Sequence, residues 1–204
     1  MKEFSYINEI YRKIIHLSSI WIVFALYYIE KPALLALFSL CTVLVMAYEF
    51  LRRGDNRAAK LLKRFLGAAL RADEEQGNFK PSGAVYVFIS ALLSTLLFSK
   101  IVAITAISVM IIGDAAAALV GAKFGRTKFK ALGKSLEGSI AFFIFSLLPV
   151  LFISRYTQAE AGYIAPAICG IFAATLVELF SKKILIDDNL SIPLTVGGVM
   201  VLLS

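Results

Sequence analysis

Charge is scarce in this 204-residue chain, in which only 17% of the residues are charged and 59% are hydrophobic. Soluble domains average about 25% charged and about 45–50% apolar residues. The apolar residues gather in runs of about 15–22 residues, a length that crosses the hydrocarbon core of a bilayer. The scarcity of charge therefore argues against a water-soluble domain and indicates one integral membrane domain over residues 1–204.

Cysteine and histidine are also scarce. Cys41 and Cys169 both lie in apolar runs without metal-ligand spacing, so we expect them to be small buried hydrophobic residues. His16 is the single histidine, and nothing else in the sequence supports a Ser-His-Asp triad. The Walker-type phosphate loop, the His-Glu-x-x-His helix and the Gly-x-Ser-x-Gly turn are absent as well. The common soluble kinase and hydrolase classes are therefore not indicated.

Seven apolar runs predict an all-α, polytopic membrane protein with about seven transmembrane helices. The runs cover residues 14–29, 33–51, 84–98, 101–122, 137–154, 161–180 and 192–203, and the last is the shortest. Within the polar stretch 52–82, apolar residues recur at helical spacing between cations, which predicts a cytoplasmic amphipathic helix at the membrane surface. The first run is not followed by a small-residue cleavage site, so we expect no cleavable signal peptide.

The distribution of Lys and Arg predicts the orientation of the chain. The N-terminus, the stretch 52–82, the loop 123–136 and the loop 181–191 hold 18 of the 21 Lys and Arg residues. The connections between them hold only Lys31, Lys100 and Arg155. Because cytoplasmic loops are enriched in Lys and Arg, we expect a cytoplasmic N-terminus and an external C-terminus. Topology thus accounts for the net charge of +7, and we expect a bilayer but no nucleic acid as partner.

Unusual polar residues gather at the predicted cytoplasmic side of the apolar runs. Carboxylates inside a membrane are costly and usually have a function or a partner. Asp114 is the sharpest case, because it lies nine residues before Lys123, or about 13 Å into the membrane if the helix is straight. The other members of this group are Arg12, Lys13, His16, Glu49, Glu137, Glu178, Asp187, Asp188 and Asn189.

Small residues and cations surround Asp114 along the sequence. Gly113, Ala117, Gly121 and Gly125 are spaced by four, which is typical of a helix-packing face or of a backbone that closely approaches a ligand. Between residues 115 and 136 the chain carries five cations and no acid, namely Lys123, Arg126, Lys128, Lys130 and Lys134. Such cations with glycines and carboxylates suit a nucleoside triphosphate with Mg²⁺. Anchoring at the cytoplasmic surface is the alternative interpretation.

Several motifs occur in order along the chain. The central ones are Gly-Asp-Ala-Ala-Ala at 113–117, Gly121, Phe-Gly-Arg at 124–126 and Lys-Ser-Leu-Glu-Gly-Ser at 134–139. Arg12 and Lys13 with His16 open the chain, and Asp-Asp-Asn-Leu-Ser-Ile-Pro-Leu lies at 187–194. Together these motifs resemble the CTP-dependent lipid kinase family, which includes dolichol kinase, phytol kinase and the yeast-type diacylglycerol kinase. The resemblance touches both ends and the centre of the chain.

The resemblance implies transfer of the CTP γ-phosphate to the hydroxyl of a membrane lipid alcohol, with Mg²⁺ or another divalent cation. We favour a polyprenol or dolichol-type alcohol over diacylglycerol or phytol, and a prokaryotic plasma membrane with the active site facing the cytoplasm. The expected catalytic residues are Asp114, Glu137, Arg12, Lys13 and His16, and the expected metal ligands are Asp114, Glu137 and Asp188. The expected nucleotide-binding residues are Gly113, Gly121, Lys123, Gly125, Arg126, Lys128, Lys134, Ser135, Gly138 and Asn189.

Two other functions stay open at this point. CDP-diacylglycerol synthase shares a related pattern and also uses CTP with Mg²⁺, but its C-terminal signature, a Gly-Gly followed by Asp-Arg-x-Asp-Ser, is absent here. A membrane transporter would line a path with Asp114, Glu178 and the glycines. However, the third, fifth and seventh runs hold almost no polar residues at mid-membrane depth. We therefore favour the kinase.

Overall fold

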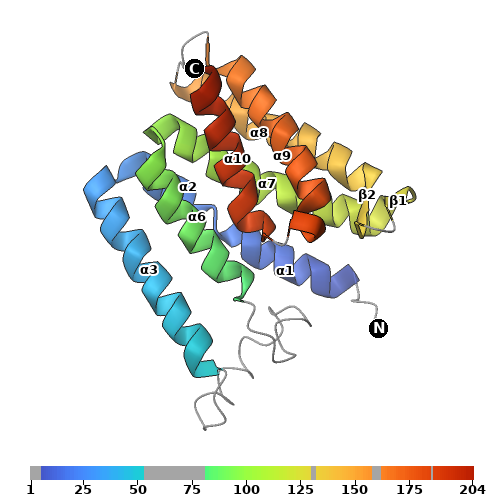
Figure 1. Cartoon of the computed structure of the whole chain (residues 1–204), viewed down its shortest axis with the longest axis horizontal. Coiled ribbons are helices and arrows are strands. Elements are labelled where there is room, and N and C mark those ends of the chain that lie inside the picture. Colours follow the sequence, from blue (N-terminus) through green and yellow to red (C-terminus); the bar gives the residue numbers. More distant parts are fainter. Residues whose placement is uncertain (1–5, 53–80, 130–131, 158–161, 185) are drawn as a thin grey trace.

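The computed structural model describes residues 6–52, 81–129, 132–157, 162–184 and 186–204, most of which are helical (Figure 1). The surface helix predicted within the stretch 52–82 falls in residues 53–80, outside the described part. The helices are α1 (Tyr6–Ser18), α2 (Trp21–Tyr28), α3 (Lys31–Arg52), α6 (Gly83–Leu97), α7 (Lys100–Phe124), α8 (Leu136–Thr157), α9 (Ile164–Ile184) and α10 (Asp188–Leu203). Two short strands, β1 (Lys128–Phe129) and β2 (Lys134–Ser135), pair antiparallel.

Within the described residues, five helical segments are long and apolar enough to cross a membrane. They are Glu9–Tyr28, Lys31–Leu51, Lys100–Phe124, Leu136–Thr157 and Ile164–Ser181. The shorter apolar helices Gly83–Leu97 and Asp188–Leu203 correspond to the third and seventh predicted runs. Each predicted apolar run thus contains helix, and five of the segments have the length and composition of a span.

Helix α7 lies at the centre of the bundle. It packs against α8, α10, α1, α2 and α6. In the apolar stretch of α7, 78% of the residues are buried inside the protein. The corresponding share is 44% for α8 and 17% for the outer segment Lys31–Leu51. The core includes Ile107 and Met110 of α7, Phe142 of α8 and Ile171 of α9, all fully buried. Asp114 therefore extends from a helix that is enclosed by protein.

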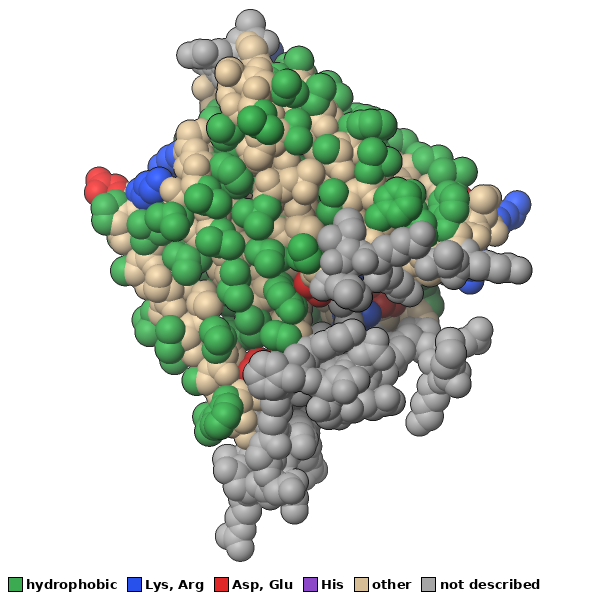
Figure 2. All heavy atoms as spheres, viewed as in Figure 1, with side chains coloured by type: hydrophobic (Ala, Val, Ile, Leu, Met, Phe, Trp, Pro, Cys, Tyr) green, Lys and Arg blue, Asp and Glu red, His purple; other side chains and the backbone are tan. Residues whose placement is uncertain are grey.

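Large hydrophobic side chains also cover the outside of the bundle. Phe152, Phe172 and Leu202 are 68%, 59% and 83% exposed, and Figure 2 shows hydrophobic side chains spread over the face in view. Such a surface is expected where acyl chains replace water as the solvent. Cys169 belongs to this outer surface, so the prediction that it is buried was wrong, while Cys41 is half-buried.

The first predicted run is not one straight helix. α1 ends at Ser18 and α2 begins at Trp21. In the turn between them the N–H groups of Ser19 and Ile20 donate to carbonyls three residues earlier, each at 3.0 Å. Such tight bonds are typical of 3₁₀ turns, and the Ser18 hydroxyl also donates to the carbonyl of Ile15 at 2.6 Å. The break separates the polar α1 from the apolar α2.

The basic loop after α7 folds as a small hairpin, which the all-α prediction did not include. Lys128 pairs with Ser135 and Phe129 pairs with Lys134. Gly133 has a φ of 63°, a left-handed conformation that glycine adopts readily. Its N–H donates to the Phe129 carbonyl at 2.9 Å. The hairpin places Lys134 immediately before α8.

Candidate active site

Helices α1 and α7 are joined by an ion pair between Lys13 and Asp114. Lys13 Nζ donates to Asp114 Oδ2 at 2.5 Å, and the two side chains are 5% and 10% exposed. His16 lies one turn further along α1, and its Nε2 is 3.6 Å from the same oxygen. Residues three apart share a helix face, so α1 presents both side chains to α7. Beside them, Arg12 forms an ion pair with Glu9 at 2.7 Å.

A second group of charges is centred on Lys134. Its Nζ donates to Glu178 Oε1 at 2.5 Å and to Asp188 Oδ2 at 3.0 Å. The hydroxyl of Ser139 on α8 reaches the other oxygen of Glu178 at 3.5 Å. Burial lowers the pKa of Lys134, but the carboxylates of Asp188 and Glu178 outweigh burial and raise that pKa above its ordinary value. Lys134 is therefore a permanent cation at physiological pH.

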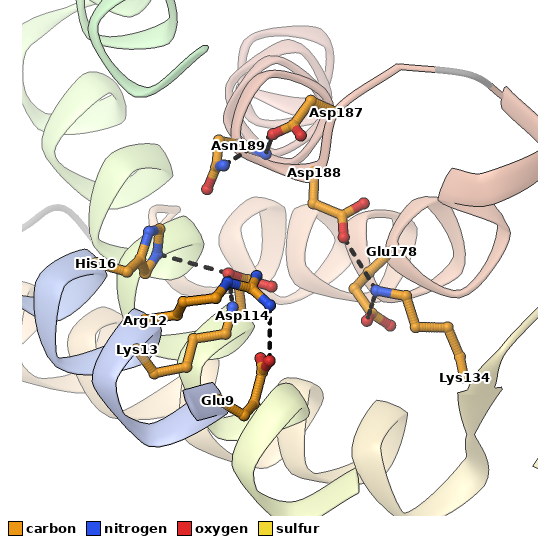
Figure 3. A network of polar contacts seen from close by, with 10 residues as sticks. All are labelled: Glu9, Arg12, Lys13, His16, Asp114, Lys134, Glu178, Asp187, Asp188 and Asn189. Atoms are coloured by element: carbon orange, nitrogen blue, oxygen red, sulfur yellow. Dashed lines mark hydrogen bonds and ion pairs between the residues drawn. The ribbon is translucent and has the colours of Figure 1, made fainter. Parts of the chain in front are cut away.

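The two groups form one network. Asp114 interacts electrostatically with both Lys134 and Glu178. Figure 3 shows side chains from α1, α7, β2, α9 and α10 directed toward a common space. The predicted site residues that the structure brings together here are Arg12, Lys13, His16, Asp114, Lys134, Asp188 and Asn189.

The start of α10 forms one wall of this space. Asp187 caps the helix, because its Oδ1 accepts from the backbone N–H of Asn189 at 3.0 Å and from Asn189 Nδ2 at 2.8 Å. The cap explains why the helix begins at Asp188, before the predicted start at residue 192. The N-terminus of a helix favours negative charge, which suits a position facing Asp114.

Several buried polar atoms of the site lack a hydrogen-bond partner. In the described part of the chain these include His16 Nε2, Asp188 Oδ1, Asn189 Oδ1 and Ser191 Oγ. Unsatisfied buried polar atoms are rare in folded proteins, and each requires an explanation. A ligand that hydrogen-bonds in this space would satisfy them.

The described residues do not form a ready-made metal cage. No group of three or more His, Cys, Asp or Glu side chains among them could hold an ion. Mg²⁺ bound with a nucleotide needs only one or two protein carboxylates, because phosphates and water supply the other ligands. Asp114 and Asp188 provide carboxylate oxygens, and Asp188 Oδ1 has no partner. These residues therefore fit a cation that arrives with a nucleotide.

The predicted glycines have a packing role. A Cβ atom on Gly138 would lie 2.9 Å from the carbonyl oxygen of Ala117, and one on Gly121 would lie 3.0 Å from Ser135 Oγ. A Cβ atom on Gly125 would lie 2.7 Å from the same Ser135 oxygen. These positions thus allow α7, β2 and α8 to approach closely, as Gly113 does against Ser146 and Phe142 of α8. Nucleotide contact by these glycines and by Ser135 stays a prediction.

Glu137 and the remaining cations occupy more open positions. Both oxygens of Glu137 accept from the backbone N–H of Thr127, at 3.0 and 3.3 Å, so this carboxylate fastens the loop to the start of α8. Its predicted roles as metal ligand and catalytic residue stay predictions. Lys123, Arg126 and Lys128 are exposed, and Lys130 lies outside the described residues.

Glu178 is absent from the expected site residues, as are Glu9 and Asp187, although all three belong to the network in Figure 3. Glu178 is 2% exposed, lies near the C-terminal end of α9, and accepts a hydrogen bond from Lys134. The available signal was a carboxylate near the cytoplasmic end of an apolar run. A partner for it was not evident, because Lys134 lies 44 residues away in the sequence.

Two known proteins are similar to this chain along most of its length, and two are similar along part of it. The chain is 33% identical over 186 residues to uncharacterized protein RP860 of Rickettsia prowazekii, covering 90% of this chain and 89% of that protein. It is 29% identical over 82 residues to dolichol kinase of Saccharomyces cerevisiae, covering 40% of this chain and 16% of the kinase. It is 29% identical over 127 residues to probable phytol kinase 1, chloroplastic, of Glycine max, covering 57% of this chain and 42% of that protein. No family profile and no solved structure matches.

The two partial similarities support an enzyme of the lipid kinase type. The apolar helices agree with a membrane protein.

Proposed function

This chain belongs to the same protein family as uncharacterized protein RP860 of Rickettsia prowazekii, and we propose that it is a CTP-dependent kinase of membrane lipid alcohols. The proposed acceptor is a polyprenol or dolichol-type alcohol, and the products are the lipid monophosphate and CDP. The observation that carries this proposal is the buried network that joins Lys13 with Asp114 and Lys134 with Glu178 and Asp188. The partial similarity to dolichol kinase and phytol kinase supports a lipid alcohol as the acceptor.

The proposed topology has seven spans with the network on the cytoplasmic side. Helices α6 and α10 contain 15 and 16 residues, so each rises about 22–24 Å. This is short for a hydrocarbon core of about 30 Å, but local bilayer thinning accommodates such helices. The excess of Lys and Arg in alternate loops supports a cytoplasmic N-terminus.

Phosphoryl transfer needs positioning and charge stabilisation more than covalent help from the protein. The alcohol oxygen forms a bond to the γ-phosphorus, the bond between that phosphorus and the oxygen bridging to the β-phosphate breaks, and the hydroxyl proton leaves to a neighbouring carboxylate or water. Lys13 and Lys134 would neutralise phosphate oxygens in a site of low polarity. Exposed Lys123 and Arg126 would attract the nucleotide.

Asp114 and Asp188 would hold the divalent cation. When bound, Mg²⁺ supplies positive charge beside the phosphates. The protein's own contribution is to keep these two carboxylates in a buried space that also contains Lys13 and Lys134.

The position of the label in CTP distinguishes this function from its rivals. Purified protein in lipid vesicles is given polyprenol, phytol or diacylglycerol with CTP labelled at either the γ- or the α-phosphate, and ATP is tested in parallel. We expect the γ label in the lipid and the α label in CDP. A cytidylyltransferase would give the reverse distribution, with the α label in the lipid. Absence of γ transfer to all three alcohols would contradict the proposal.

A further inference from the structure

The amide of Asn189 has a fixed orientation that leaves its oxygen available. A carboxylate can only accept hydrogen bonds, so the 2.8 Å contact with Asp187 Oδ1 must be made by the NH₂ group of Asn189. The side chain is buried, with 6% of the residue exposed, and its Oδ1 has no hydrogen-bond partner among the described residues. Figure 3 shows this oxygen on the side away from Asp187, facing the space beside His16.

His16 contributes the second unsatisfied atom of this space. Its Nε2 is buried, has no hydrogen-bond partner in the part of the chain that the structure describes, and lies 3.6 Å from Asp114 Oδ2. His16 also interacts electrostatically with Asp187, the residue that holds Asn189. The two unsatisfied atoms therefore lie in one region, between α1 and the start of α10.

We propose that Asn189 and His16 form the subsite for the hydroxyl group of the acceptor lipid, an assignment that rests on the proposed function. An alcohol carries one O–H donor and an oxygen that accepts. Before transfer the donor satisfies Asn189 Oδ1, and the oxygen lies beside His16 and Asp114. During transfer the proton leaves to a neighbouring carboxylate or water, because an amide oxygen is not a base. This role differs from the nucleotide-binding role that the sequence predicts for Asn189.

A nucleotide phosphate does not suit the same place. An ionised phosphate oxygen has no hydrogen to donate to Asn189 Oδ1, and it would leave that acceptor unsatisfied. The cation of Lys134 lies instead against Glu178 and Asp188. The surroundings of Lys134 thus suit phosphates, whereas the amide oxygen of Asn189 suits a hydroxyl.

The surroundings of this subsite also suit a lipid. Ile14 and Ile15 of α1 are 57% and 51% exposed, directly beside the buried Lys13 and half-buried His16. The apolar exterior therefore begins one residue from the polar network, so an acyl or prenyl chain can stay outside while its head group enters. On the opposite side, a Cβ atom on Gly83 would lie 3.1 Å from Asn189 Nδ2, which places the start of α6 against this amide.

A matched pair of ligands tests the subsite without catalysis. Geranylgeraniol and its methyl ether differ in that only the alcohol can donate a hydrogen bond. We measure equilibrium binding of both to the full chain in nanodiscs without nucleotide. We expect the wild-type protein to bind the alcohol about tenfold more tightly, the effect of one buried hydrogen bond. Equal affinity for the two ligands would overturn the subsite, and this result does not depend on any variant.

Variants then test which residues cause the preference for the alcohol over its methyl ether. Asn189→Ala should reduce the preference for the alcohol. His16→Ala should instead weaken binding of the alcohol and of its methyl ether alike, because both ligands carry the oxygen that lies beside His16. Asn189→Ala should also raise the KM for the alcohol about tenfold while changing the KM for CTP less than twofold. Thr195→Ala is the control, because it removes a hydroxyl of the same helix that donates to the Ser191 carbonyl at 2.8 Å. A preference that persists in Asn189→Ala contradicts the assignment.

The same measurements separate the two proposals. Transfer of the γ-phosphate with an unchanged KM for the alcohol in Asn189→Ala would overturn the subsite and leave the kinase. A preference for the alcohol without any transfer would support the subsite and contradict the kinase. Failure of both measurements would overturn both proposals.

Discussion

At the scale of single residues, Lys13 and Asp114 depend on each other. Lys13 is 4% and Asp114 7% exposed, and an isolated charge at such a position is costly. Asp114→Asn should abolish transfer and also lower the free energy of unfolding by about 3 kcal/mol, because it leaves Lys13 without a counter-charge. The double variant Lys13→Met/Asp114→Asn should recover most of the stability and none of the activity. Thermal unfolding in detergent measures this, and a double variant no more stable than Asp114→Asn would contradict the pairing.

Lys134 and its two partner carboxylates also depend on each other for charge compensation. Lys134→Met should lower the free energy of unfolding by about 3 kcal/mol, because Glu178 and Asp188 lose their cation. Since the folded-state pKa of Lys134 is raised, its stabilising charge is complete below the ordinary value of about 10.4 and is lost only as pH rises through the raised pKa. The difference between wild type and variant should therefore be equal at pH 7 and pH 9. A difference that falls between these values would show that Lys134 titrates earlier.

At the scale of elements, the contact between α7 and α8 depends on missing side chains. Gly138→Ala should lower the unfolding free energy by about 1–3 kcal/mol, because its Cβ atom would approach the Ala117 carbonyl oxygen at 2.9 Å. Gly198→Ala on α10 is the matched control, since a Cβ atom there meets nothing within 4 Å. In thermal unfolding, Gly138→Ala should therefore be less stable than Gly198→Ala. Equal stabilities would show that the helices separate without cost.

The long helices could be predicted from the sequence, whereas their breaks and caps could not. Apolar runs determine where a chain can cross a bilayer, so α3, α7 and α8 agree with their runs within a few residues. The turn at Ser19 depends on two local carbonyl contacts, and the early start of α10 depends on the Asp187 side chain. The β1–β2 hairpin depends on the backbone of Gly133. Hydropathy does not record such contacts.

The sequence predicts several residues of the candidate site, but not which of their charges pair with each other. The sequence predicts Asp114 as a site residue because carboxylates in membranes are costly, and Lys134 because it belongs to the basic loop and its motif. Which cation faces which carboxylate depends on the packing of α1, α7, α9 and α10, and no spacing in the sequence specifies it. For this reason Glu178 is absent from the expected site residues, although it accepts from Lys134. Glu137 accepts from the Thr127 N–H, and its predicted role as a metal ligand stays a prediction.

At the scale of the whole molecule, the topology can be tested by labelling. In a background without Cys41 and Cys169, we place a single cysteine by Lys128→Cys or by Ser204→Cys. A membrane-impermeant maleimide should label intact cells only at position 204 and should label position 128 only after lysis. Labelling of position 128 in intact cells would reverse the proposed orientation and place the network outside the cytoplasm.

The proposed function requires that the buried network performs transfer. Vesicles containing either the wild-type protein or Asp114→Asn are supplied with polyprenol, Mg²⁺ and CTP labelled at the γ-phosphate, and lipid-bound label is counted. We predict label in polyprenol monophosphate with the wild type and none with the variant, while both proteins stay folded. Equal incorporation by the two proteins, or none by the wild type, would contradict the account.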